Sequence, residues 1–155
     1  MCSRRLASAL VCSVLLAAVR SARPVAREVR ALVWAAVVPD SGTATTRRFQ
    51  DWPGWMTKGL LDVLCPMAYS TEDAVFRQPV EHARTAARGR PVWAGIGASR
   101  LTGDQTLKQI QDARSLGVDG VILFSYDSLV NLSRGSDNLA RIGAQAFGQC
   151  HAPAW

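Results

Sequence analysis

The chain has 155 residues, 48% hydrophobic and 19% charged, a balance that suits one packed α/β domain and excludes a disordered chain. Its net charge of +6 is spread along the sequence without a basic run of five or more, so nucleic-acid binding is not expected. The four cysteines form no CxxC pair and are widely spaced, so a zinc site and a disulfide framework are not expected. No cofactor is expected either.

Residues 1–24 allow two interpretations. Arg4 and Arg5 precede an apolar run over residues 6–19, like the charged and apolar regions of a signal peptide. However, Arg20 stands where a cleavage site ending at Ala22 needs a small residue, and the run is too short to span a bilayer. The segment also fits a buried helix that ends near Pro24. Composition favours the signal peptide, and no stable membrane span is expected.

Four apolar bursts follow, nearly continuous in Val, Ile, Leu, Ala and Trp, over residues 31–39, 61–69, 91–97 and 120–126. This pattern is typical of parallel strands that are buried on both faces, and it predicts that Trp34 and Trp93 lie in the core. Helical stretches separate the bursts, so the sequence predicts an α/β fold of four parallel strands, each followed by a helix. In such folds the functional groups collect where strands end.

The connecting segments carry helix start and stop signals. Residues 39–45 are rich in turn formers and are expected to form a loop. Asp51 and then Ser70 or Thr71 are expected to cap helices, and residues 102–104 are expected to open another. Four helices are expected, over residues 52–58, 71–88, 103–114 and 138–147. The sequence suggests no repeat beyond this alternation of strands and helices.

The most specific segment ends the second burst. Pro66 lacks the backbone N–H that a strand needs, so it marks the strand end, and Met67 and Tyr69 would then stand at the mouth of a cleft. An aromatic face stacks on the C–H surface of a sugar, so Tyr69 is a candidate glycan contact. The alternative, that Tyr69 plugs the mouth of a barrel, is equally open.

Other candidates also follow strands. Ser125, Tyr126 and Asp127 close the last burst, where Asp127 could act as an acid or base, or cap a short turn. Gly95 and Gly97 allow close approach of a ligand, although steric relief beneath a helix explains them better. The further candidate contacts are Gln50, Asp51 and Asp40.

Glycoside hydrolysis normally needs two carboxyl groups facing each other about 5 to 10 Å apart. Once the acids that start helices are set aside, Asp40 and Asp127 remain, and nothing in the sequence makes them a convincing pair. The catalytic residues are therefore unknown, with Asp127 as the candidate.

Residues 49–69, 95–97 and 113–126 resemble the glycosyl-hydrolase-10-like family (the DUF187 group), and the similarity covers roughly residues 4–147. The resemblance implies a (β/α)8 (TIM) barrel, located outside the cytoplasm and acting on glycans that include peptidoglycan. Arg4 and Arg5 match an Arg-Arg pair that follows the family's acidic motif, similar to H-F-D-D-Y-x-Y-P, which is absent here. Ser99 stands where the family commonly has tyrosine.

The resemblance thus implies a partial (β/α)8 barrel. Residues 1–24 would be its fourth helix, residues 25–150 half a barrel, and residues 151–155 a tail. The implied function is that of a glycoside hydrolase fragment, inactive alone, which self-associates through exposed sheet edges. A non-catalytic carbohydrate-binding module and, less favoured, a phosphate-binding barrel enzyme are the alternatives.

Overall fold

The computed structural model describes residues 32–130 and 138–148 and shows a mixed α/β fold with short parallel strands. The elements are, in chain order, β1 (Trp34–Val37), α2 (Ser41–Arg48), α3 (Trp52–Thr57), β2 (Val63–Pro66), α4 (Asp73–Ala86), β3 (Trp93–Ile96), the 3-10 turn η1 (Ala98–Arg100), α5 (Gly103–Ser115), β4 (Gly120–Leu123), α6 (Tyr126–Leu129), α7 (Asn138–Ile142) and the π-helical turn η3 (Gly143–Phe147). The segments expected at residues 1–24 and 151–155 lie outside the described residues.

The strands form two parallel pairs, β1 with β2 and β3 with β4. Two isolated parallel bridges, from Leu64 to Val92 and from Met67 to Gly95, connect β2 to β3. The four predicted strands and their parallel direction are thus confirmed. Residues 32–130 and 138–148 contain neither a closed barrel nor a continuous four-stranded sheet.

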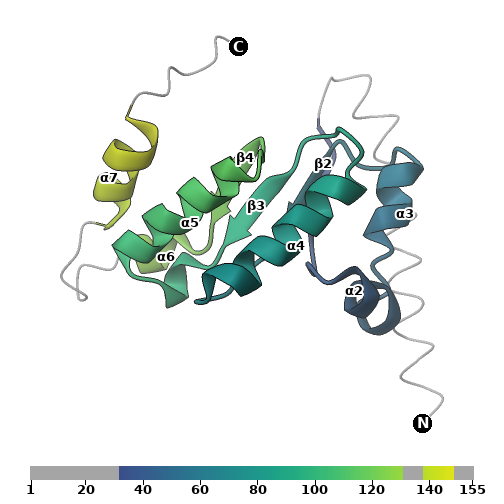
Figure 1. Ribbon diagram of the computed structural model, residues 1–155, viewed down its shortest axis with the longest axis horizontal. Helices are drawn as coiled ribbons and strands as arrows, with labels where there is room; N and C mark the ends of the chain where they lie inside the picture. The colour runs from purple at the N-terminus through teal and green to yellow at the C-terminus, as the bar shows by residue number, and fades with distance from the viewer. Residues whose placement is uncertain (1–31, 131–137, 149–155) are drawn as a thin grey trace.

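Helices α4 and α5 lie on one side of the strands, as Figure 1 shows. Successive strand side chains point to opposite faces, and the alternate residues that face these helices supply the core. They include Val37, Leu64, Val92, Ala94 and Ile96. Trp52 and Trp55 dock α3 onto the same core, as the sequence predicted.

Trp34 does not lie in the core, contrary to the prediction. Its side chain is 52% exposed, because it points away from the helices on β1, which lies at the end of its sheet. Strand β1 therefore alternates between exposed and covered residues, whereas β2 is buried at all four positions. The apolar burst at residues 31–39 predicted the strand correctly but not its exposure.

Two helix predictions need correction. Residues 41–48, expected largely as a loop, form α2, because Asp40 caps its first turn and Ala44 buries its inner face. Helix α4 begins at Asp73 after Glu72, whereas Ser70 uses its hydroxyl to accept the Glu72 N–H at 3.0 Å instead of capping the helix. The predicted cap Asp51 is confirmed, and α5 begins where expected, with Thr102 as its cap.

The two strand pairs repeat one arrangement, which the sequence analysis missed. Asp62 accepts the Val33 N–H and Asp119 accepts the Val92 N–H, both at 2.9 Å. In return, the two aspartate N–H groups donate to the carbonyls of Val33 and Val92 at 2.7 and 2.9 Å. The signal available in the sequence was Val-Trp-Ala, which occurs at residues 33–35 and again at 92–94.

Candidate functional site

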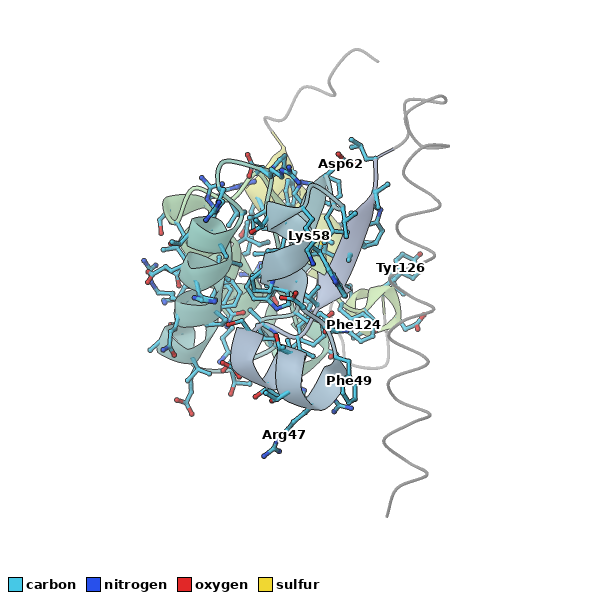
Figure 2. All side chains as sticks on the ribbon, turned by 90° about the vertical axis from the view of Figure 1, so that its right-hand side faces the viewer. Arg47, Phe49, Lys58, Asp62, Phe124 and Tyr126 are labelled. Atoms are coloured by element: carbon cyan, nitrogen blue, oxygen red, sulfur yellow. The ribbon has the colours of Figure 1, made fainter. Side chains whose placement is uncertain are left out.

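Three aromatic side chains follow the carboxyl ends of β2 and β4, and we call Tyr69, Phe124 and Tyr126 the aromatic rim. The rings of Tyr69 and Phe124 stack with their centroids 5.5 Å apart and their planes at 14°. Phe124 is 54% exposed and Tyr126 is 66% exposed. Figure 2 shows both on the same flank of the molecule. Such exposed rings offer flat apolar surface to a ligand.

Two glycines make room for Tyr69. A Cβ atom on Gly97 would lie 3.0 Å from the Tyr69 Cβ, and one on Gly95 would lie 3.3 Å from the Tyr69 Cε1. The space beside these glycines was expected to accommodate a helix, but it accommodates Tyr69. Partial burial raises the pKa of the Tyr69 phenol, so this hydroxyl stays protonated at neutral pH. The ring is therefore fixed at its base, with a neutral hydroxyl at its tip.

The residues after Phe124 form a short turn. Ser125 precedes α6 as its N-cap. Its N–H donates to the Ser128 hydroxyl at 3.3 Å, and its carbonyl accepts from that hydroxyl at 2.7 Å. Asp127 lies in the first turn of α6 and is exposed. The structure thus brings Ser125 and Asp127 next to Tyr126 at the end of β4.

The other candidate contacts hold the backbone. Gln50 accepts the Val38 N–H with its Oε1 at 3.0 Å, which ties the start of α3 to the end of β1. Asp51 accepts the Gly54 N–H at 3.0 Å as the cap of α3. Met67 is half-buried at the bridge to Gly95. None of these three contacts depends on a ligand.

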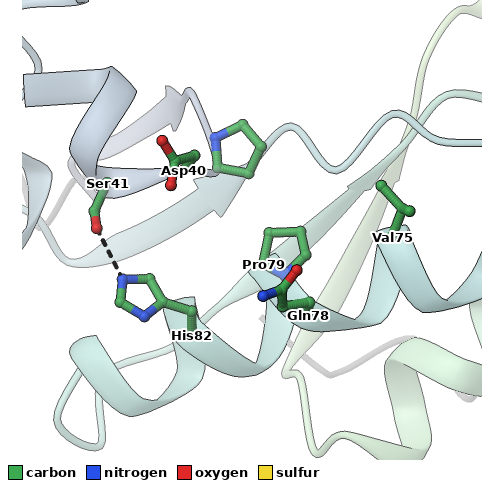
Figure 3. A pocket seen from close by; sticks show the side chains of 7 residues that line it. Asp40, Ser41, Val75, Gln78, Pro79 and His82 are labelled. Atoms are coloured by element: carbon green, nitrogen blue, oxygen red, sulfur yellow. Dashed lines mark hydrogen bonds between the residues drawn. The ribbon is translucent and has the colours of Figure 1, made fainter.

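Asp40 lies at a different place, in a cavity of about 450 Å³ between α2 and α4 (Figure 3). Its Oδ1 accepts the Thr43 N–H at 2.7 Å, and hydrogen bonding to the side chain and then the backbone of Thr43 lowers the pKa of the carboxyl. The lining residues are Pro39, Asp40, Ser41, Val75, Gln78, Pro79 and His82.

A serine and a histidine meet in this cavity. The Ser41 Oγ lies 3.0 Å from the His82 Nε2, and the Trp52 ring meets the imidazole edge-on with centroids 5.6 Å apart. Nucleophilic catalysis needs a third group that orients the imidazole. Within the described residues the hydrogen bonds of His82 lead to Ser41 alone. The pair therefore joins α2 to α4, and among the described residues no third group is hydrogen-bonded to the imidazole.

The sequence does not identify Ser41 and His82 as partners, since 41 residues separate them. A periodic signal was present, because Val75, Pro79 and His82 follow helical spacing and line one side of the cavity. Over residues 32–130 and 138–148, no three His, Cys, Asp or Glu side chains gather as metal ligands. In the same residues, no helix has the length and apolarity of a membrane span.

Comparison with known proteins gives no relative. No family model, no curated protein and no solved structure matches the chain. The fold and the site define an α/β protein with an exposed aromatic rim at strand ends. The resemblance to the glycosyl-hydrolase-10-like family stays a prediction.

Proposed function

We propose that this chain binds glycans through the aromatic rim. The observation that carries the proposal is the exposure of Phe124 and Tyr126 beside the stacked Tyr69, at the carboxyl ends of parallel strands. Aromatic faces that remain exposed fit the C–H surface of sugar rings, and the Tyr69 and Tyr126 hydroxyls can bond to sugar hydroxyls. The resemblance to a family that acts on peptidoglycan makes such strands the first glycan to test.

The architecture that we propose is half of a (β/α)8 barrel, with β1 to β4 in sequence order. The bridges between β2 and β3 support this order, because they join the two strand pairs in the parallel sense. Self-association through the sheet edges and a location outside the cytoplasm belong to the same proposal, the latter from the family resemblance alone.

Glycan binding without catalysis is favoured over hydrolysis by the roles of the acids. Asp40 and Asp51 cap helices, whereas Asp62 and Asp119 hold strand backbone. Phosphate binding after β3 is disfavoured, because Tyr69 occupies the space beside Gly95 and Gly97.

Replacing Tyr126 tests the proposal. Tyr126→Ala removes an exposed stacking surface worth about 1 kcal/mol, so retention on insoluble peptidoglycan should weaken about fivefold. The melting temperature should hardly change, because the side chain is 66% exposed.

Two matched variants sharpen this test. Tyr126→Phe keeps the ring and should retain most of the binding. Val75→Ala shortens a side chain on α4 that is 54% exposed and should leave retention unchanged. Equal retention by Tyr126→Ala and the unmodified chain would show that the rim is not a glycan site.

A further inference from the structure

The two strand pairs leave two sheet edges free within the described residues. Strand β1 has β2 on one side, and β4 has β3 on one side. The outer edges of β1 and β4 therefore present backbone N–H and C=O groups that can pair with another strand. Trp34 on β1 and Phe124 just after β4 are more than half exposed beside these edges.

The repeated arrangement indicates which strand can pair with each free edge. Trp34 lies opposite Val63 in the first pair, as Trp93 lies opposite Gly120 in the second. Strand β3 thus corresponds to β1, and β4 corresponds to β2. Since β2 already accepts β3 on its outer edge, the outer edge of β4 is suited to accept a β1 strand.

The junction inside the chain also fixes the register of that pairing. Leu64 bridges to Val92, and the Leu64 N–H donates to the Pro91 carbonyl at 3.1 Å. The residue that corresponds to Leu64 is Val121, and the one that corresponds to Val92 is Val33. A β1 strand on the edge of β4 would therefore place Val33 opposite Val121.

We propose that the β1 strand on this edge comes from a second copy of the chain. In a twofold dimer, β4 of each copy meets β1 of the other, which uses both edges of both copies and leaves none open. The eight strands then form a closed ring, a number at which side chains fill the interior of a barrel. The pairing continues, at the free edges, the junction that β2 and β3 make within one chain.

This inference rests on the proposed strand order and is independent of glycan binding. It is tested by cross-linking in the full chain, with Cys2, Cys12 and Cys150 changed to serine. Val33→Cys combined with Val121→Cys should give a covalent dimer on mild oxidation, because paired Cα atoms in adjacent strands lie within disulfide range.

A matched control replaces the neighbouring aliphatic residue of β4. Val33→Cys combined with Ile122→Cys places the two thiols on opposite faces of the sheet, so dimer formation should fall at least tenfold. Equal cross-linking of both variants would refute the register. A disulfide closed within one chain would refute the second copy, and a ladder of larger species would refute the closed ring.

Sedimentation of the unmodified chain gives a measurement without cysteine variants. A mass of two chains supports the dimer, and a monomer over the micromolar range overturns it. Tyr126→Ala distinguishes the two proposals, since its glycan retention should weaken about fivefold while it sediments as the same dimer.

Discussion

At the scale of single residues, the aromatic rim depends on two positions without a side chain. Gly97 lies against the Cβ of Tyr69, and Gly95 lies against the edge of its ring. A Cβ atom on Gly95 would also lie 2.9 Å from the carbonyl oxygen of Pro66. Any side chain at either glycine competes with Tyr69 for the same space. The two glycines at the end of β3 thus set the orientation of the Tyr69–Phe124 stack.

Gly97→Ala tests this dependence. The added methyl group would overlap Tyr69, so the free energy of unfolding should fall by about 1 to 3 kcal/mol, and glycan retention should fall with it. Gly143→Ala is the matched control, since nothing lies within 4 Å of its Cβ position. It should leave stability unchanged or raise it by up to about 1 kcal/mol in urea unfolding. Equal stability of the two variants would contradict the packing role of Gly97.

Residue types predicted the positions of the rim tyrosines after strand ends, but they did not predict the contacts of the polar candidates. Tyr69 and Tyr126 were found because they follow apolar strands, and the rule about strand ends places such residues together. Gln50 binds backbone at the end of β1, and Asp40 binds backbone in α2, which the sequence could not distinguish from binding a ligand. The contact of Ser41 with His82 depends on the packing of α2 against α4, so no local pattern reveals it.

At the scale of elements, helix caps decide where the connecting segments become regular. Thr102 accepts the Gln105 N–H at 3.2 Å, and the Gln105 side chain accepts the Thr102 N–H at 2.9 Å. This reciprocal pair satisfies two of the donors that the start of α5 leaves without helical partners. Helix α5 carries Ile110 and Ala113 of the core, so its start also positions that packing.

Thr102→Ala should therefore lower the free energy of unfolding by about 1 kcal/mol. Thr85→Ala provides the comparison, because the Thr85 hydroxyl only donates to the Glu81 carbonyl inside α4, at 3.1 Å. We expect that change to lie within about 0.5 kcal/mol of zero. Chemical unfolding of both variants measures the difference, and a loss of the same size in each would contradict the cap.

The strands and the strongly capped helices were predictable because their signals are local. Apolar bursts marked β1 to β4, and Thr102 marked α5. Helix α2 was missed because its Ser, Gly and Thr residues have low helix propensity, which a cap and one buried alanine overcome in the folded chain. The exposure of Trp34 was missed because it depends on which strand stands at the end of a sheet.

At the scale of the whole molecule, the described residues contain two equivalent strand pairs, and parallel bridges between β2 and β3 connect them. The sequence predicted the parallel direction, but it did not reveal the equivalence, which is carried by the matching bonds of Asp62 and Asp119. The sequence also could not predict which strand pairs with the outer edges of β1 and β4, because the backbone groups at a strand edge are the same in every sequence. In the proposed dimer, pairing across those edges involves a second copy of the chain.

The whole chain should bind glycans without cleaving them. Hydrolysis needs two carboxyl groups facing each other across the scissile bond. Among the aspartates of residues 32–130 and 138–148, four hold backbone, at positions 40, 51, 62 and 119, and three form ion pairs, at positions 73, 104 and 112. Among these aspartates of the described residues, Asp127 alone has neither kind of contact.

A reducing-end assay on peptidoglycan strands checks this expectation. The purified chain should release no more reducing ends than a boiled sample, while the glycan remains bound in a pull-down of the same mixture. Asp127→Asn should leave both results unchanged, because a single carboxyl group cannot supply the acid and the base or nucleophile together. Release well above the boiled sample, lost in Asp127→Asn, would instead make Asp127 a catalytic residue and would require a second carboxyl group close to the rim.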